Sequence, residues 1–267
     1  MPRTGIYCAD GAEACKSPEQ TDPPCCNGVF LPGMTGGLPR SERTIAELLR
    51  RVGYSTSAIG KWHLDAGSGE HLPSQFGFNE YYGVPHGVGA CPCAACFPPN
   101  RTCFTPVVGH VPCEPTWAPC PVFRSSGGER ERIVQQPADL LALGDQYLKA
   151  AESFVARSSN GDGSPWFLYY ATHHVHSPQF GGATSVAPGA YGAERGEFGA
   201  ALAELDRHMG RLLAAVDAAG AAERTFVLFL SDNGPSLRNG VHGGNAGLLK
   251  CGKGTTYEGE CRRLLLS

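Results

Sequence analysis

The chain has 267 residues, of which 42% are hydrophobic and 18% are charged, which is enough apolar material for one large globular domain. Its formal net charge of -3 provides no basic surface, so nucleic acid is not an expected partner. The sequence also contains no apolar stretch long enough to predict a transmembrane segment.

The first predicted elements follow an irregular segment. Residues 1–40 are dominated by Gly, Pro, Cys and polar residues and are predicted to lack regular structure. A helix is predicted over 44–52, because Thr44 and Glu47 form a capping box ahead of apolar residues with helical spacing. We expect this apolar stripe to face a core, and a short strand to follow over 54–59. The stripe consists of Ile45, Leu48, Leu49 and Val52.

The remaining elements alternate between helix and strand. Residues 84–128 are predicted to be a long loop rich in cysteine and proline. Helical periodicity then predicts a second helix over 140–155 and a third over 198–216. Between them, an apolar run predicts a strand over 166–171. A last apolar run, 225–230, predicts a buried strand. The helical apolar positions are Leu140, Leu141, Gly144, Leu148, Ala151 and Val155, then Phe198, Ala201, Leu202, Leu205, Met209, Leu212, Leu213 and Val216.

This alternation predicts an α/β fold. Its sheet is expected to be mixed and mainly parallel, with helices on both faces. No internal repeat or domain linker is visible, so the whole chain, 1–267, is treated as one domain. In such sheets ligands bind beyond the carboxyl ends of the strands.

The cysteines favour an oxidising compartment. Six of the twelve lie in the 84–128 loop, without the paired spacing that zinc sites show, so disulfides are favoured over a metal cluster. Asn100, in the same loop, begins a glycosylation acceptor sequence. The start of the chain, however, has no apolar core of a signal peptide. The six cysteines are Cys91, Cys93, Cys96, Cys103, Cys113 and Cys120.

Polar residues follow the last predicted strand directly. Asp232 and Asn233 provide oxygen atoms of the kind that Ca²⁺ or Mg²⁺ binds. The same residues favour an ordinary Asp-Asn-Gly-Pro turn for local backbone reasons. On this pair alone the turn is the favoured interpretation.

Basic side chains follow the other two strands. Lys61 and His63 alternate after the first strand, where a cation and a titratable ring suit an anionic ester. His176 is one of three histidines within 173–176, and one of them is expected in a site. Lys253 lies between glycines that permit close approach of an anion, although the segment is not a Walker loop. Taken singly, Lys61 and His63 are better explained as a solvated lysine and a structural histidine, and Lys253 by itself carries little information.

Taken in order, these segments resemble the sulfatase family, and within it the arylsulfatases. The resemblance extends from about Gly36 to Gly259, and the pairing of GKWHL with GKGTTYEG is its most specific part. It implies an alkaline-phosphatase-like fold. The matching segments are GGLPRSERTIAELLRRVGYSTSAIGKWHL, CFPP, PWFLYYATHHVHSPQF, SDNGP and GLLKCGKGTTYEGE.

The resemblance implies a role for each candidate residue. It implies that Asp232 and Asn233 ligate Ca²⁺, with Mg²⁺ possible, and that His63 assists the nucleophile. The implied substrate is a sulfate ester of a small molecule, a glycolipid or a saccharide, in a lysosomal or secreted protein. The implied sulfate contacts are Lys61, His176 and Lys253.

The family's nucleophile has no counterpart in the sequence. Sulfatases of this kind use formylglycine made from a cysteine in Cys-x-Pro-Ser-Arg, upstream of the GKWHL segment and together with two further aspartates. Cys113 and Cys120 lie downstream and lack the full motif, so neither is assigned as nucleophile. The chain is therefore expected to be a sulfatase catalytic domain truncated at both ends and inactive by itself. The usual partner of Cys251 is expected beyond its end, and the alternatives are a non-catalytic remnant and a phosphate-ester hydrolase of the same superfamily.

Overall fold

The computed structural model describes residues 37–65, 69–87, 120–161, 163–177, 179, 196–255 and 257–261. The predicted irregular segment before residue 37, and most of the cysteine-rich loop with Asn100, lie outside the described residues. The helices are α1 Ile45–Arg51, α3 Leu143–Ser159, α4 Gly196–Ala218 and α5 Glu258–Cys261, and the 3-10 helices are η3 Pro73–Phe76, η6 Ala222–Arg224 and η7 Leu237–His242. The strands are β1 Ser55–Gly60, β2 Glu80–Gly83, β3 Val122–Ser125, β4 Arg132–Gln135 and β5 Trp166–Ala171.

The strands form one mixed sheet in the order β4-β3-β2-β1-β5. β1 is parallel to both β2 and β5, whereas β3 and β4 are antiparallel to their neighbours. The predicted α/β class with a mixed sheet is confirmed. The parallel part, β2-β1-β5, brings the carboxyl ends of these strands to one edge.

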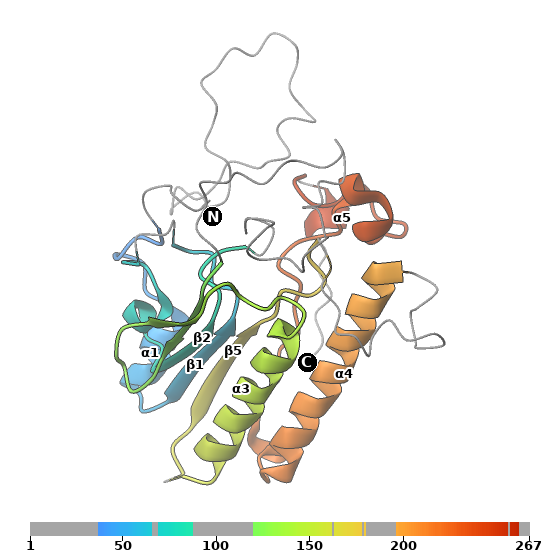
Figure 1. Cartoon of the computed structure of the whole chain (residues 1–267). Helices are drawn as coiled ribbons and strands as arrows, with labels where there is room; N and C mark the ends of the chain where they lie inside the picture. Colours follow the sequence, from blue (N-terminus) through green and yellow to red (C-terminus); the bar gives the residue numbers. More distant parts are fainter. Residues whose placement is uncertain are drawn as a thin grey trace.

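Helices cover both faces of the sheet, as Figure 1 shows with α1 on one side and α3 and α4 on the other. Adjacent residues of β1 point into different cores, because side chains alternate along a strand. Ala58 packs in a cluster with Ala46 and Phe76, while Ile59 packs in a cluster with Leu143 and Tyr147 of α3. β1 is buried from Thr56 to Gly60 although half of its residues are polar, and the Thr56 hydroxyl donates to the Gly77 carbonyl.

Local capping signals in the sequence are realised. The Thr44 side chain accepts a hydrogen bond from the Glu47 backbone N–H, at 3.1 Å, and so begins α1 as the capping box predicts. Ahead of α3, the Asp139 carboxylate accepts from the N–H groups of Leu141 and Ala142. The second predicted helix therefore begins at Leu143, three residues later than its apolar pattern indicates.

The predicted buried face of α1 is wrong, and the apolar pattern of α4 is borne out only in part, since Ala201 and Val216 are buried but other apolar positions are exposed. In α1 the Ala46 side chain is buried, whereas Ile45 and Leu48 of the expected stripe are exposed. The backbone of Gly77 lies against that of Ala46 and Glu47, and a small residue at the contact permits this close approach. In α4 the buried side chains include Glu204 and His208, and the expected stripe is exposed at Leu202 and Leu213.

The predicted strand at 225–230 is also wrong. This segment follows η6 in extended conformation, but it belongs to none of the five strands of the described sheet. A strand needs a neighbour for its backbone hydrogen bonds, and no described strand pairs with this segment along its length. The side chains of Phe226, Val227, Leu228 and Leu230 are consequently exposed rather than buried.

The predicted loop at 84–128 contains more structure than expected. Its described end forms β3, which pairs with β2 and with β4. Cys120, just before β3, is fully buried and disulfide-bonded, but its partner lies outside the described residues. The short strands β2, β3 and β4 have only four residues each, too few to give a periodic signal in the sequence.

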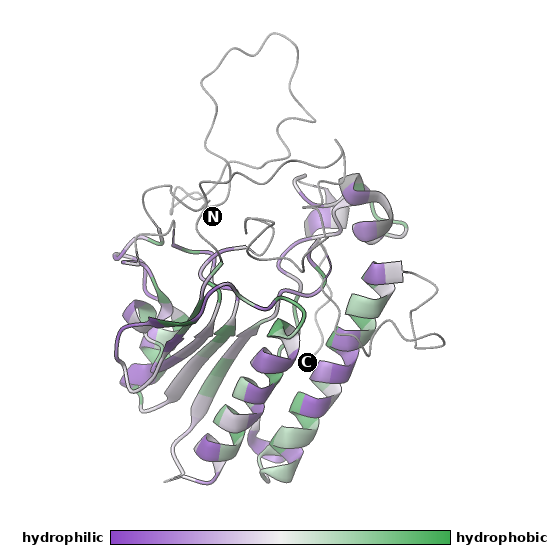
Figure 2. Cartoon of the chain, viewed as in Figure 1, coloured by the Kyte–Doolittle hydropathy of each residue, from purple (hydrophilic) through white to green (hydrophobic). Residues whose placement is uncertain are grey.

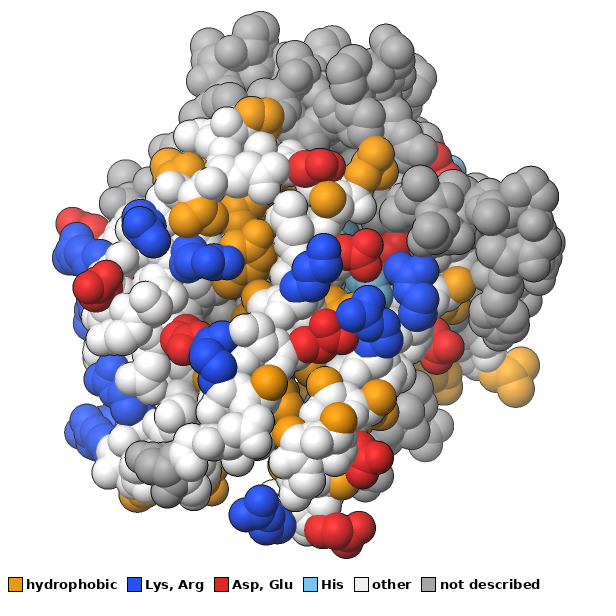
Figure 3. All heavy atoms as spheres, turned by 60° about the horizontal axis from the view of Figure 1, so that its bottom comes forward, with side chains coloured by type: hydrophobic (Ala, Val, Ile, Leu, Met, Phe, Trp, Pro, Cys, Tyr) orange, Lys and Arg blue, Asp and Glu red, His pale blue; other side chains and the backbone are white. Residues whose placement is uncertain are grey.

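The surface carries mixed charge. Figure 3 shows acidic and basic side chains interspersed on one face, without a large patch of one sign. In Figure 2 hydrophilic and hydrophobic residues alternate along α3 and α4, as expected of helices that pack on one side only. Each helix that the structure describes is too short or too polar to cross a membrane.

Candidate active site

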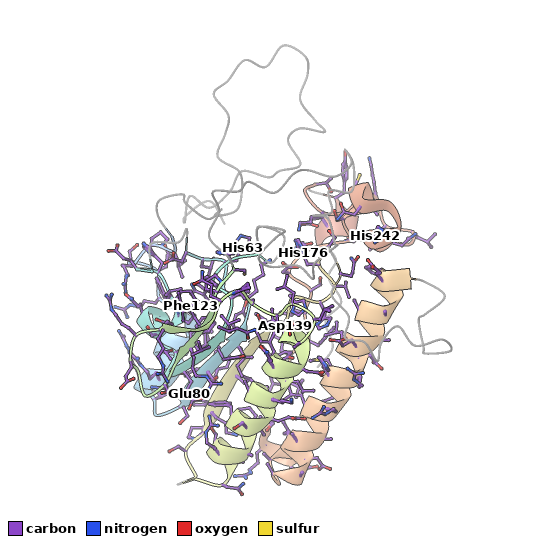
Figure 4. The ribbon with its side chains drawn as sticks, in the orientation of Figure 1. His63, Glu80, Phe123, Asp139, His176 and His242 are labelled. Atoms are coloured by element: carbon purple, nitrogen blue, oxygen red, sulfur yellow. The ribbon has the colours of Figure 1, made fainter. Side chains whose placement is uncertain are left out.

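Two of the predicted site segments meet at the carboxyl edge of the sheet. Gly60 pairs with Ala171, so the ends of the parallel strands β1 and β5 lie together. The backbone N–H of Lys61 donates to the Ala171 carbonyl at 2.8 Å, which fixes the start of the first segment against the end of β5. Figure 4 shows His63 and His176 at this end of the sheet, away from Glu80 at the start of β2.

The backbone of the 60–63 segment is tightly constrained. A Cβ at position 60 would lie 2.0 Å from the Ala171 carbonyl oxygen, so only glycine fits there. His63 has a φ of 58°, a left-handed conformation that costs energy for a residue with a side chain. Its N–H donates to the Pro85 carbonyl at 2.8 Å, which helps hold that conformation. Gly87 leaves room for the imidazole, since a Cβ there would approach its Cε1 to 3.3 Å.

His176 lies in a positive electrostatic field. Burial, Lys61 and Lys253 lower the pKa of His176 to about 4, against smaller opposing effects of the Ser177 carbonyl and Asp232. The imidazole is therefore neutral at pH 7. Its Nδ1 lies 2.6 Å from the Ser177 carbonyl oxygen, so Nδ1–H donates there and Nε2 remains for another partner.

Lys61 belongs to the same group of charges. Burial lowers the pKa of Lys61, Asp232 raises it and Lys253 lowers it further. Lys61, His176, Asp232 and Lys253 thus lie within electrostatic range of one another, although they come from four separate segments of the sequence. A pocket with these side chains favours an anion, because the lysines repel each other until negative charge lies between them.

The Asp232 turn and the Lys253 loop are joined by their backbones. The Lys253 N–H donates to the Pro235 carbonyl at 2.9 Å, and the Gly234 N–H donates to the Glu260 carboxylate at 2.7 Å. A Cβ at position 234 would lie 2.0 Å from the Gly259 carbonyl oxygen, so glycine permits the close approach. This contact explains how a turn after residue 230 and a loop after residue 250 supply one site.

Asp232 and Asn233 have the donor atoms of a calcium site but not its full number. Ca²⁺ takes six to eight oxygen ligands. The pair supplies one carboxylate and one amide at the tip of a turn, and Asp232 is exposed. Ser231 donates to the Asn233 carbonyl at 2.7 Å, which is typical of a polar turn. The pair therefore fits a hard cation only if other oxygens complete the shell.

Comparison with known proteins gives this geometry a family. The protein-family model described as Sulfatase matches residues 18–265. The chain belongs to the sulfatase family. Among curated relatives of this sulfatase chain, human arylsulfatase A is 41% identical over 243 residues, which cover 90% of the chain and 45% of the relative. Human N-acetylgalactosamine-6-sulfatase is 31% identical over 239 residues, which cover 88% of this chain and 41% of the relative.

Solved sulfatase structures share the fold. The PsFucS1 sulfatase from Pseudoalteromonas sp. superposes with a TM-score of 0.68 at 20% identity, covering 89% of this chain and 47% of that one. Ps i-CgsB in complex with k-i-k-neocarrahexaose superposes with a TM-score of 0.63 at 27% identity. The match covers 86% of this chain and 48% of that one. This sulfatase chain spans less than half the length of these proteins.

Two features of this sulfatase chain were not predicted. His86 follows β2 and is buried at the carboxyl edge of the parallel strands, where burial lowers its pKa, while Gly87 and Asp65 raise it. β2 reads Glu-Tyr-Tyr-Gly and ends three residues before His86, so no apolar run in the sequence marks this histidine. His174, by contrast, lies 3.2 Å from Glu204 of α4, so the histidines of 173–176 do not share one site.

Proposed function

We propose that this chain forms the sulfate-binding part of an arylsulfatase-like hydrolase of sulfate esters. Membership of the sulfatase family supports the reaction class. The observation that carries the proposal is the contact of the Lys61 N–H with the Ala171 carbonyl, which joins the Lys61 segment to the end of β5 ahead of His176; burial, Lys61 and Lys253 together lower the pKa of His176. Two cations that lower the pKa of one imidazole create a place where an anion relieves their repulsion.

In this proposal each basic group contacts sulfate oxygen. Lys61 and Lys253 donate from their ammonium groups, which are compact point charges suited to a tetrahedral anion. His176 approaches with Nε2, since Nδ1–H is already donated to the Ser177 carbonyl. A bound dianion raises the pKa of His176, so the ring gains a proton on binding and Nε2–H becomes a donor. As charge gathers on sulfate oxygens and leaving oxygen, these donors stabilise it.

Asp232 and Asn233 are the proposed ligands of Ca²⁺, with Mg²⁺ as the other candidate. A divalent cation bound there supplies charge that polarises a sulfate oxygen. Asp232 already acts on both Lys61 and His176, so its carboxylate is close enough to link a cation to the sulfate pocket. With two protein ligands from the described residues, we expect weak binding of the cation in the absence of sulfate.

His63 is proposed to assist the nucleophile. Formylglycine is the nucleophile expected by family resemblance, and the 267 residues contain no Cys-x-Pro-Ser-Arg from which to make it. The chain alone is therefore proposed to bind sulfate without hydrolysing esters. We treat it as part of a catalytic domain whose activity needs residues that this sequence does not contain.

The substrate class and compartment are also part of the proposal. A small-molecule, glycolipid or saccharide sulfate ester fits a site that recognises the sulfate group itself. One structural neighbour, Ps i-CgsB, is described in complex with a saccharide, k-i-k-neocarrahexaose. Similarity to arylsulfatase A and the disulfide-bonded Cys120 support a lysosomal or secreted protein.

The proposal is tested by calorimetric titration of the 267-residue chain with sulfate, with and without Ca²⁺. We expect saturable binding that Ca²⁺ strengthens, and that the Asp232→Asn variant loses the Ca²⁺ effect but keeps weak sulfate binding. Absence of saturable sulfate binding in the folded chain would leave the non-catalytic remnant as the better interpretation.

The reaction is tested on any longer product of the same gene that carries the cysteine motif. Paired aryl sulfate and aryl phosphate substrates should give faster turnover of the sulfate. Phosphate turnover well ahead of sulfate turnover would instead identify a phosphate-ester hydrolase of the same superfamily.

A further inference from the structure

A second cluster of ligand groups lies outside the sulfate pocket, between α3, α4 and the loop after β5. His174, Glu204 and His208 each present a ligand atom, and these atoms lie within 4.8 Å of one another. The side chains are 1%, 2% and 0% exposed, respectively. Glu204 and His208 occupy the core-facing side of α4, where an amphipathic helix normally has apolar residues.

The distances between these atoms suit one small cation. His174 Nε2 is 3.2 Å from Glu204 Oε1, and His208 Nε2 is 4.0 Å from the same oxygen. Asp145 Oδ1 of α3 lies 3.0 Å from His208 Nε2 and provides a fourth candidate ligand. In a tetrahedral zinc site with bonds of about 2.1 Å, neighbouring ligand atoms are about 3.4 Å apart. The spacings of the two histidines from Glu204 lie on either side of this value, whereas Asp145 lies outside the group of atoms within 4.8 Å of one another and must turn toward it to bind.

The structure leaves space at the centre of the cluster. Gly144 of α3 faces it, and a Cβ there would lie 2.7 Å from Glu204 Oε1, 2.9 Å from His174 Cε1 and 3.1 Å from His208 Cε1. Glycine is a poor helix former, so its position in the first turn of α3 is not explained by helix propensity. It is explained if the groups around it need room to converge.

The hydrogen bonds around the cluster also prepare the ligands. Thr172 Oγ1 lies 2.7 Å from His174 Nδ1, where it accepts the Nδ1–H once a cation takes the Nε2 lone pair; without a cation, Nε2–H donates to the Glu204 carboxylate. His208 Nδ1 is buried and makes no hydrogen bond with any described residue. The Tyr170 hydroxyl is likewise buried without a described partner, and it lies within electrostatic range of Glu204 and Asp145.

One cationic side chain competes for the cluster. Arg207 Nη2 lies 3.4 Å from His208 Nε2 and 3.8 Å from Asp145 Oδ1. The Arg207 side chain is 41% exposed, so it is able to turn toward water when another cation binds. Two carboxylates and two imidazoles then neutralise a divalent ion with borderline ligand preference.

We propose that His174, Glu204, His208 and Asp145 bind a zinc ion that ties α3 and α4 to the loop carrying His176. The role is structural, because the ion connects three elements; His174, Glu204 and His208 are buried, while Asp145 is 49% exposed and forms the solvent side of the site. Binding at His208 Nε2 moves the proton that this nitrogen donates to Asp145 onto Nδ1, which is buried without a described partner. This site is distinct from the calcium site proposed at Asp232 and Asn233, which has only oxygen ligands.

The proposal is tested with Zn²⁺ titrated by calorimetry into the full chain after its free thiols are alkylated. We expect one equivalent to bind, with affinity reduced about hundredfold or more in Glu204→Gln and in His208→Ala. Gly144→Ala, which fills the central space but keeps every ligand, should weaken binding as well. His71→Asn, a histidine variant outside the cluster, and Asp232→Asn should still bind one equivalent of Zn²⁺. If both Glu204→Gln and His208→Ala still bound one equivalent of Zn²⁺ with unchanged affinity, the proposed site would be wrong.

A spectroscopic measurement keeps the test decisive if these variants do not fold. Co²⁺ substituted into the unaltered chain should give the visible bands of a tetrahedral nitrogen and oxygen site, without sulfur-to-metal charge transfer. A spectrum dominated by sulfur ligands, or none at all, would contradict the proposal.

Discussion

His174 and His176 belong to one loop, two residues apart, yet lie in opposite electrostatic surroundings. His176 is influenced by Lys61 and Lys253, and its pKa is lowered to about 4. His174 lies 3.2 Å from the Glu204 carboxylate, which is 2% exposed. One imidazole therefore belongs to a pocket suited to an anion and the other to a pocket suited to a cation.

The difference shows that residue type does not decide the ligand of a histidine. The neighbours that decide the ligand come from elements distant in sequence. For His176 they are lysines, one after β1 and one in the 250–260 loop, and for His174 it is the Glu204 carboxylate of α4. The loop after β5 separates the two pockets. Substitutions that remove one set of neighbours should affect one pocket and spare the other.

The largest expected effect follows removal of a lysine from the sulfate pocket. Lys61→Ala and Lys253→Ala should each weaken sulfate binding about tenfold or more, because a charge-assisted hydrogen bond is lost. Calorimetry of sulfate binding measures the change. Lys250→Ala is the matched control, since its ammonium lies over the Tyr257 ring at 4.0 Å and takes no part in the proposed site. Equal losses in all the variants would mean that only net charge matters.

A smaller loss is expected when the pocket is distorted without loss of charge. Gly234→Ala places a Cβ against the Gly259 carbonyl, so the Asp232 turn should move away from the Lys253 loop. Sulfate affinity should fall severalfold while Zn²⁺ binding is unchanged. Gly210→Ala, on α4 where a Cβ meets nothing within 4 Å, should keep sulfate affinity and stabilise the fold by about 0.5 to 1 kcal/mol. Unchanged sulfate affinity in Gly234→Ala would show that the two segments need not be in contact.

The pH dependence has a defined sign. Without sulfate, the pKa of His176 in the folded chain lies below its ordinary value of 6.5. As the pH falls, His176 therefore takes up a proton in the unfolded chain at a higher pH than in the folded chain. Its contribution to stability is present above pH 6.5 and is lost as the pH falls toward 4. Thermal denaturation should show a larger loss in the wild type than in His176→Gln over this range. Sulfate should reduce the loss, because the bound dianion favours the protonated ring. Identical pH profiles for the two proteins would contradict this role.

The smallest effect concerns the side of α4 that faces solvent. Leu213→Ser should change the free energy of unfolding by no more than about 0.5 kcal/mol, because Leu213 is 50% exposed. Val216→Ala, at a position 7% exposed, should cost about 1.5 kcal/mol. Chemical denaturation measures both. A loss of about 2 kcal/mol or more in the free energy of unfolding for Leu213→Ser would instead show that this position is buried, as the apolar pattern predicts.

The sequence predicted the strands and helices wherever local signals dominate. The capping pair Thr44 and Glu47, the short strand that became β1 and the apolar run that became β5 depend on neighbours in the chain and were identified correctly. The meeting of the segments that carry Lys61 and His176 was also predicted, since both follow parallel strands whose ends lie together. Their functional roles remain predictions until sulfate binding is measured.

The wrong predictions involve partners distant in sequence. The apolar run at 225–230 has strand-forming residues, but pairing requires a neighbouring strand that the described sheet does not provide. On α4, hydrophobic periodicity selected Leu202 and Leu213, whereas Glu204 and His208 are buried because His174 and Asp145 supply polar partners. No local pattern contains that information, because the partners come from β5's loop and from α3.

The contrast between the two histidines is tested most directly by NMR of the imidazole resonances of the full chain. Sulfate is added in one titration and Zn²⁺ in another. The account predicts that sulfate raises the pKa of His176 and leaves His174 unaffected, while Zn²⁺ shifts the resonances of His174 and His208 and leaves those of His176 in place. Sulfate that fails to raise the pKa of His176, or that acts equally on His174, would contradict the proposed sulfate pocket.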